Sequence, residues 1–176
     1  LSTYREKALF GNATWKFTDK FDISGGLRWA RNEQKFTQIT EGAIVPTENR
    51  GGQSEEEVVT FSVGPRWRPN DDVMAYFRVA SGYRPGGPNV FLPGVPRMVK
   101  SDTLTNYELG VKAQLFDRMV TVDAAVFRMD WSDIQLTLNF GGVTGGANAG
   151  RARSQGIEGS VLNQPAPGLS IALNGA

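Results

Sequence analysis

NYELGVKAQL, residues 106–115, alternates polar and apolar side chains without a break. Tyr107, Leu109 and Val111 share one parity, while Glu108 and Lys112 take the other. Because a period of two places successive side chains on opposite faces of a β-strand, this stretch predicts a strand with one apolar face and one polar face.

The same alternation recurs along the chain, in residues 21–29, 58–67, 73–84 and 169–174. Placing every such stretch gives about eight strands and no helix. A membrane-spanning helix needs about 20 consecutive apolar residues, and every apolar run here is broken well before that length. Transmembrane β-strands need only about 9 to 11 alternating residues. The pattern therefore predicts an all-β, antiparallel, up-and-down transmembrane β-barrel segment.

One stretch, residues 120–131, leaves the phase of its strand open. It begins with valines on one parity, but Phe127, Met129 and Trp131 fall on the opposite parity. A β-bulge near Ala124 and Ala125 restores a single apolar face. Without a bulge, the three large side chains line the interior.

Short polar turns and long loops rich in glycine and proline alternate along the chain. The short turns fall at residues 18–20, 68–72, 117–118 and 165–168, and long loops are expected at residues 37–56, 85–102 and 139–153. Hairpin loops usually have about 2 to 5 residues. Tight turns at one end and long loops at the other are typical of outer-membrane barrels, in which the loops face outward.

Aromatic residues on the apolar parity gather at two levels, as in the two aromatic girdles of a membrane barrel. The level beside the short turns holds Trp15, Phe17, Phe21 and Trp67, and the level one membrane crossing away holds Trp29, Tyr83 and Tyr107. A β-sandwich with an aromatic core is the alternative interpretation.

Seven charged residues within the strands fall on the polar parity. They are Arg28, Arg66, Arg78, Arg84, Glu108, Lys112 and Glu158. A cation that faces lipid at the bilayer midplane costs about 2 to 4 kcal/mol, so we expect these side chains to face a wet interior. They either line a passage or form structural ion pairs.

The composition excludes several classes of function. The 176 residues include no histidine and no cysteine, and 19 Lys and Arg against 18 Asp and Glu give a net charge of +1. We therefore expect no zinc or iron-sulfur site, no cofactor, no cysteine or histidine catalysis and no nucleic-acid partner. Asp130 and Asp133 do not make a catalytic carboxylate pair, because their odd spacing puts them on opposite faces of a strand.

Four blocks together resemble the later barrel strands of TonB-dependent outer-membrane receptors, in the order of that family. They are SGYRPGGPN (81–89), NYELGVK (106–112), AVFRMDWSDIQ (125–135) and NAGRARSQGIEG (148–159). The resemblance covers most of the chain from Ala8 onward. It implies a barrel of about 22 strands, closed by an N-terminal plug domain, in the outer membrane of a Gram-negative bacterium.

The resemblance also implies a function and partners. Such receptors import scarce ligands, most commonly ferric siderophores, with energy from the inner-membrane TonB complex. We expect residues 1–176 to be part of such a barrel, without the plug, the early strands or the last strands. Its partners are then outer-membrane lipid, the rest of the barrel and its plug, TonB through that plug, and a small anionic ligand such as a ferric siderophore.

Three other functions remain open at this point. The main alternative is a self-contained eight-stranded outer-membrane barrel with a structural or adhesive role. Glycines on the polar parity, such as Gly64 and Gly110, favour a large lumen over a filled small barrel. The second alternative is a hydrolase embedded in the membrane, but the chain contains no histidine, which such enzymes commonly use as a base. The third is a soluble, carbohydrate-binding β-sandwich, in which the apolar side chains of the strands are buried in a core away from water.

The resemblance does not identify the ligand. We expect ligand contacts from basic and aromatic side chains of the loops, since such side chains suit a small anionic ligand. These candidates are Tyr83, Arg84, Phe91, Arg97, Lys100, Arg151 and Arg153.

Overall fold

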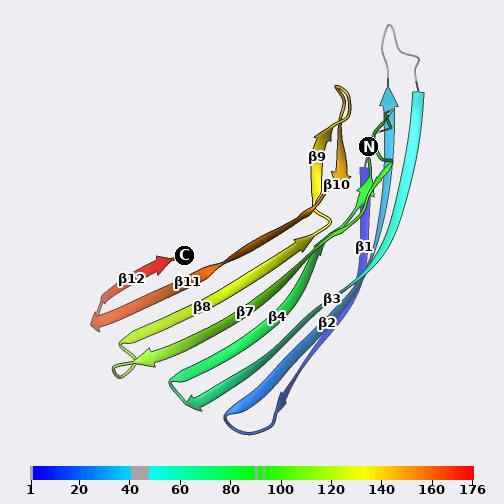
Figure 1. The fold of residues 1–176 in the computed structure, drawn as a ribbon. Coiled ribbons are helices and arrows are strands. Elements are labelled where there is room, and N and C mark those ends of the chain that lie inside the picture. The colour runs from blue at the N-terminus through cyan, green and yellow to red at the C-terminus, as the bar shows by residue number, and fades with distance from the viewer. Residues whose placement is uncertain (1, 41–47, 90, 93) are drawn as a thin grey trace.

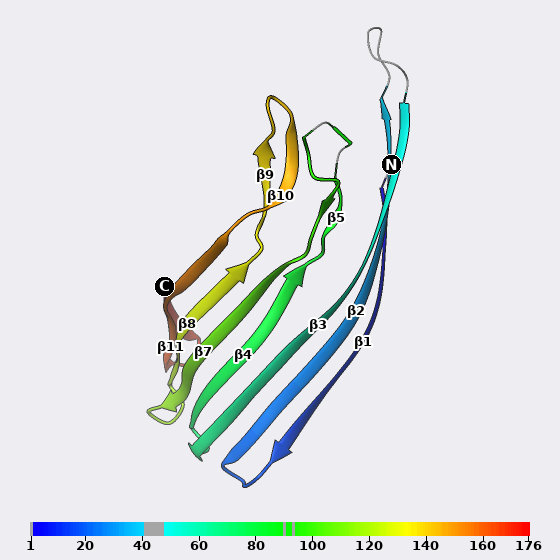
Figure 2. The same ribbon diagram turned by 45° about the vertical axis from the view of Figure 1, so that its right-hand side comes forward.

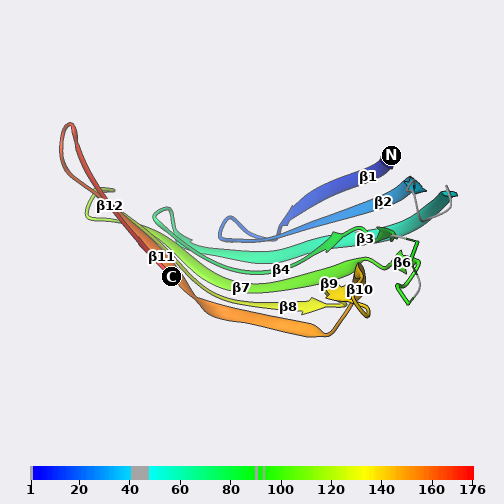
Figure 3. The same cartoon turned by 90° about the horizontal axis from the view of Figure 1, so that it is seen from above.

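Eight antiparallel strands form one open sheet in a computed structural model that describes residues 2–40, 48–89, 91–92 and 94–176. The strands are β1 (Ser2–Lys16), β2 (Phe21–Thr40), β3 (Glu48–Asn70), β4 (Val73–Arg84), β7 (Asp102–Leu115), β8 (Val120–Ser132), β11 (Arg151–Ala166) and β12 (Leu169–Gly175). They follow one another in that order across the sheet, and the view from above shows that the sheet is curved (Figure 3). The predicted all-β antiparallel fold is confirmed.

Two small hairpins lie in the long connections. β5 (Gly87–Pro88) pairs with β6 (Met98–Val99), and β9 (Gln135–Asn139) pairs with β10 (Thr144–Asn148). Both lie at one end of the sheet, while the tight turns lie at the other end (Figure 1). This confirms the expected arrangement of short and long connections. Within the described residues, no helix is long and apolar enough to cross a membrane.

The boundaries expected for the loops were partly wrong. β2 continues to Thr40 and β3 begins at Glu48, so much of the expected loop at 37–56 is strand; residues 41–47 lie outside the described residues. The sequence does not signal this extension, because both faces of the hairpin carry mostly polar side chains and no apolar alternation marks it. Backbone pairing, the ion pair of Arg31 with Glu55 and the packing of Phe36 on Phe91 hold it. The expected loop at 139–153 likewise contains β10 and the start of β11.

The register separates the two faces of the sheet. One face, called the apolar face below, carries odd-numbered residues of β1 to β4, β7, β11 and β12 and even-numbered residues of β8. Large hydrophobic side chains are exposed on it, including Leu9 at 74% and Ile157 at 69%. The other face, called the polar face, carries the charged residues predicted to face a wet interior. Lipid or partner surface must cover the apolar face.

β8 contains no bulge. Its pairs with β7 and with β11 run unbroken from Val120 to Ser132, so Phe127, Met129 and Trp131 lie on the polar face. Two features accommodate these large side chains. A Cβ on Gly156, which pairs with Phe127, would lie 3.1 Å from the Phe127 ring, and the Arg84 guanidinium lies 5.8 Å from the Trp131 ring centroid.

The lower aromatic girdle is confirmed at the turn end. The rings of Trp15 and Phe17 stack with centroids 5.7 Å apart, and Phe21 lies 5.8 Å beyond Phe17 and opposite Trp67. Trp29 follows Phe21 by eight residues, or about 26 Å along the strand. With the strand tilt of about 35–45° usual in such barrels, this length corresponds to a height of about 20 Å, somewhat less than their apolar band of about 25 Å.

The upper girdle differs from the expectation at one position. Trp29 and Tyr107 are on the apolar face, but the Tyr83 hydroxyl accepts a hydrogen bond from Asn32 of the polar face at 2.8 Å. The pairing of β3 with β4 ends at Ser62 and Ala80, and Phe61 N instead donates to Ser81 Oγ at 2.9 Å. Above this point the end of β4 departs from β3, and Tyr83 turns toward the interior.

Candidate functional site

Charged side chains of the polar face are paired across neighbouring strands. Asp22, which is 3% exposed, accepts bonds from Arg66 Nε at 2.6 Å and Arg68 Nη1 at 2.5 Å. Other pairs join Arg28 to Glu6, Arg78 to Glu108 and Lys112 to Asp123. The interpretation of these residues as structural ion pairs of a wet interior fits this geometry.

A hollow of about 650 Å³ lies on the polar face beside Tyr76, Glu108, Lys112 and Glu158. The Tyr76 hydroxyl donates to Glu108 Oε1 at 2.7 Å, and Arg78 Nη2 donates to Oε2 at 3.1 Å. Gly110 permits this arrangement, since a Cβ there would lie 2.5 Å from the Tyr76 ring. The hollow is open, and its charged side chains offer hydrogen bonds to any segment that fills the interior.

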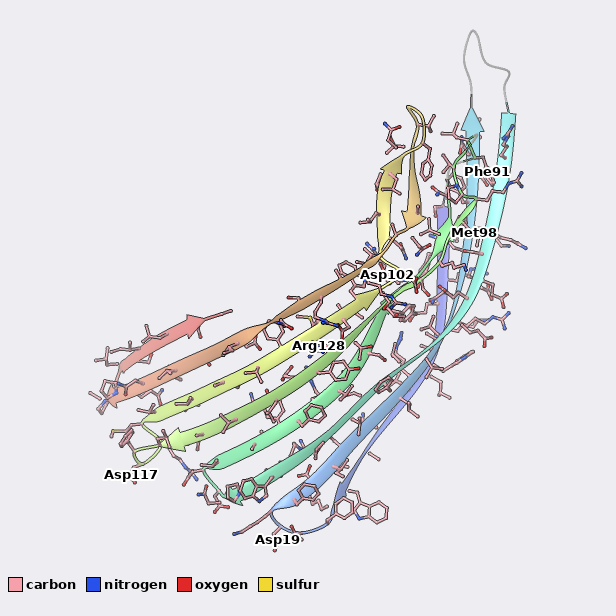
Figure 4. All side chains as sticks on the ribbon, in the orientation of Figure 1. Asp19, Phe91, Met98, Asp102, Asp117 and Arg128 are labelled. Atoms are coloured by element: carbon pink, nitrogen blue, oxygen red, sulfur yellow. The ribbon has the colours of Figure 1, made fainter. Side chains whose placement is uncertain are left out.

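The connection from β4 to β7, residues 85–101, is called the inner loop here, because its described part lies against the polar face of β2 and β3. The Glu56 carboxylate accepts bonds from the backbone N–H groups of Gly86 and Ser101, both at 3.2 Å. Phe91 N donates to Gln38 Oε1 at 3.1 Å. Figure 4 shows Phe91 beside the upper ends of β2 and β3. The loop therefore narrows the outer entrance of the interior.

A buried carboxylate fixes the base of the inner loop. Asp102 is 2% exposed, and its Oδ2 accepts bonds from Arg84 Nη2 at 2.5 Å and from Gln135 N at 3.1 Å. The Gln135 side chain donates to the carbonyls of Arg84, Pro85 and Lys100 at 3.2, 3.0 and 3.0 Å. Both ends of the inner loop and the segment that follows β8 therefore meet at Asp102.

The β9–β10 hairpin packs against the inner loop. Asn89 donates from Nδ2 to the Gly146 carbonyl at 2.6 Å and accepts from Gly146 N at 3.1 Å. A Cβ on Gly145 would lie 2.4 Å from Val95 Cγ1, so glycine is needed for this approach. Figure 2 shows the hairpin and β5 side by side above the sheet. The two loops form one connected structure at the entrance.

Three tyrosine and asparagine side chains form a chain of hydrogen bonds near the entrance. Tyr4 Oη donates to Asn32 Oδ1 at 2.6 Å, and Asn32 Nδ2 donates to Tyr83 Oη at 2.8 Å. Burial, followed by the hydrogen bond to Glu6, raises the pKa of Tyr4 to about 12. The phenol therefore stays protonated and keeps its donor role at physiological pH.

The structure brings together only some of the candidate ligand contacts. Tyr83, Arg84, Phe91, Arg97 and Lys100 belong to the end of β4 or to the inner loop. Arg84 is paired with Asp102, whereas the side chains of Arg97 and Lys100 are exposed. The last two candidates, Arg151 and Arg153, lie instead on the apolar face of β11.

Sequence reasoning missed the residues that shape the entrance, including Glu56, Asn89, Asp102 and Gln135. Glu56 lies in an acidic run that reads as solvated, and the others lie in segments without periodicity. Only their partners, distant in sequence, reveal their roles. Among the described residues, no group of acidic side chains is arranged to hold a metal ion.

Comparisons with known proteins agree along the whole chain. The family model for the TonB dependent receptor-like β-barrel matches residues 2–176. The pesticin receptor of Yersinia enterocolitica is 32% identical over 178 residues, which cover 99% of this chain and 26% of that receptor. The chain thus spans about a quarter of the length of this relative.

Solved structures give the same result. The ferric yersiniabactin uptake receptor of Yersinia pestis is 28% identical with a TM-score of 0.83, covering 98% of this chain and 26% of that chain. The ferric-catecholate import receptor Fiu of E. coli, in its closed form, is 17% identical with a TM-score of 0.74, covering 99% of this chain and 29% of that chain. The second likeness concerns the fold alone.

Proposed function

The chain belongs to the family of TonB-dependent receptor-like β-barrels, and from that premise we propose that it forms part of the wall of an outer-membrane receptor for energised uptake of a ferric siderophore. The relatives described above are named as receptors, not as enzymes. In this proposal the receptor lies in the outer membrane of a Gram-negative bacterium, and residues 1–176 form one part of a larger barrel.

The open sheet supports a larger barrel over a closed one of eight strands. β1 and β12 are the two edges of the sheet, and among the described residues they pair with β2 and β11 only. A self-contained barrel would pair them with each other, because an open edge in lipid leaves backbone groups without partners. Further strands continue the barrel in this proposal, and a plug docks on the polar face and contacts TonB.

The inward fold of the inner loop is the observation that carries the proposal of ligand capture. The loop carries Phe91 and the exposed cations Arg97 and Lys100, and Tyr83 and Arg84 lie at the end of β4 from which the loop begins. Cations at the mouth attract an anionic ferric complex, and aromatic rings pack against the aromatic groups of phenolate or catecholate chelators. Arg151 and Arg153 are left out, because they lie on the apolar face.

Uptake and binding measurements on the full-length protein test this proposal. The probes are phenolate, catecholate and hydroxamate siderophores loaded with radioactive iron, offered to cells with and without a protonophore. We expect one class to be taken up only by energised cells, and Arg97→Gln to weaken its binding roughly tenfold through loss of a charge-assisted contact. Lys20→Gln, at the opposite end of the sheet, is the matched control.

Two results would count against the proposal. The first is the absence of energised uptake for every ferric complex. The second is an affinity that Arg97→Gln, Lys100→Gln and Phe91→Ala all leave equal to that of the Lys20→Gln control.

A further inference from the structure

Three arginines lie on the apolar face near the loop end of the sheet. The register places Arg153 opposite Asp130 and Arg151 opposite Ser132, and it places Arg128 in the row of Tyr107. Even-numbered residues of β8 share the apolar face, so these charges do not face the interior. Figure 4 shows Arg128 on the upper half of β8.

Asp130 holds two of these guanidinium groups side by side. Arg128 Nε donates to its Oδ2 at 2.9 Å, and Arg153 Nε donates to its Oδ1 at 2.7 Å. Both bonds join a guanidinium group to the carboxylate, and such charge-assisted bonds favour its ionised form. In the bonds to Asp130 both arginines donate from Nε. Their Nη groups make no bond to Asp130 and can donate to another anion.

The height of the cluster matches a membrane interface. Tyr107 belongs to the upper aromatic girdle, and exposed Val126 and Ile157 lie one row below the level of Arg128. Asp130 and Arg153 lie two residues higher, about 7 Å further along the strands. Apolar side chains below and cations above reproduce the order of acyl chains and headgroups in a lipid leaflet.

A second charged cluster on the same face, around Arg31, contains more carboxylates than arginines. Arg31, above the girdle residue Trp29, is surrounded by carboxylates: Nη2 lies 2.6 Å from Glu55, Nε 3.7 Å from Glu33 and Nη1 3.8 Å from Glu57. Its charge is already neutralised by its neighbours. The cluster on β8 and β11 sets three arginines against one aspartate and keeps a net positive charge.

We propose that Arg128, Arg151 and Arg153, with Asp130 as their spacer, bind the phosphate groups of the phosphorylated glycolipid in the outer leaflet. Guanidinium groups bind phosphate oxygens through paired N–H donors. The hydroxyl of Ser132 lies in the row of Arg151 on the same face and suits the sugar ring. The long loops mark this end of the sheet as external, which selects the outer-leaflet lipid over an inner-leaflet phospholipid.

Lipid binding by the full-length protein in detergent tests this assignment, with native mass spectrometry as the readout. The probes are an acylated glucosamine disaccharide with two phosphates, the same lipid without phosphates, phosphatidylglycerol and inorganic phosphate. We expect the bisphosphorylated glycolipid to bind most tightly, and Arg128→Gln and Arg153→Gln each to weaken it roughly tenfold. Arg31→Gln, the matched control on the same face, should leave binding unchanged.

The assignment is overturned if no lipid is retained, or if the phosphate-free glycolipid or phosphatidylglycerol binds as tightly as the bisphosphorylated glycolipid. It is also overturned if inorganic phosphate at equal concentration displaces that glycolipid, or if Arg31→Gln weakens its binding as much as Arg128→Gln and Arg153→Gln do. Heat-modifiable gel mobility identifies variants that do not fold, and Arg128→Lys, which keeps the charge, should retain most of the affinity.

The inference uses the membrane placement in the proposed function but not its ligand. The two can fail separately, because the cluster and the entrance lie on opposite faces of the sheet. Siderophore binding should be unchanged in Arg128→Gln and Arg153→Gln. Failure of siderophore uptake in the parent protein, with lipid binding intact, would remove the proposed ligand and leave the lipid site standing.

Discussion

Charged and polar side chains on the polar face are matched to partners that the register places beside them. Asp22 is the clearest case, since a carboxylate that is 3% exposed meets two arginines of β3. Removing both arginines would leave the buried carboxylate of Asp22 without a partner, which is far costlier than the loss of an exposed pair. The alternation of the sequence predicted that these residues face inward, but not which residue pairs with which.

The phenol of Tyr4 provides a test at the scale of one residue. Its pKa is raised to about 12 in the folded protein, against about 10 in an unfolded chain. The stabilisation of its neutral form is therefore complete below pH 10 and is lost as the pH rises toward 12. We expect Tyr4→Phe to make the free energy of unfolding less steeply dependent on pH between 10 and 12. Equal slopes for the parent and Tyr4→Phe, in urea unfolding of the full-length protein in detergent, would contradict this expectation.

Single strands of this sheet were readily predicted where one face is apolar and the other polar, as in residues 106–115, which lie within β7. The prediction was weakest for β8, where aromatic side chains share the polar face with Asp123. Periodicity reports only that two residues share a face. Which face is apolar must come from the neighbouring strands, and here the pairing of Lys112 with Asp123 decides it.

Glycine positions give a test at the scale of a strand pair. A Cβ on Gly64 of β3 would lie 2.7 Å from the Phe77 carbonyl oxygen of β4, whereas a Cβ on Gly11 of β1 meets nothing within 4 Å. We expect Gly64→Ala to destabilise the barrel by about 1 to 3 kcal/mol, because backbone must move. Gly11→Ala should leave stability unchanged or raise it by up to about 1 kcal/mol. Unfolding midpoints of the two variants in detergent distinguish these outcomes. Equal midpoints would contradict the prediction, because they would mean that the backbone of β4 moves away from the added Cβ at no cost in stability.

The whole sheet is open, with β1 and β12 at its edges. In lipid, each unpaired backbone N–H or C=O group at an edge costs several kcal/mol. We expect residues 1–176 expressed alone to give no energised siderophore uptake and no heat-modifiable monomer on gels, with the full-length protein as the positive control. Either activity or a compact monomer from the isolated chain would favour the self-contained eight-stranded barrel.

The entrance also belongs to the scale of the whole molecule. Glu56 of β3 holds both ends of the inner loop, and Asn89 of that loop holds Gly146 of β10. These contacts join segments that are 30 to 57 residues apart in the chain. Nothing in the composition of the loops predicts them, since loops rich in glycine and proline follow no period.

The sequence by itself determined that the chain is a set of antiparallel strands with an apolar face, with tight turns at one end, long connections at the other and charges on the inner parity. Those properties are local, because strand geometry alone fixes which side chains share a face. Only the tertiary structure decided the phase of β8, the inward fold of the inner loop and the placement of Arg153 on the apolar face. These depend on register and on hydrogen bonds between distant segments, and the energies of such contacts are set by their partners in space rather than by their neighbours in sequence.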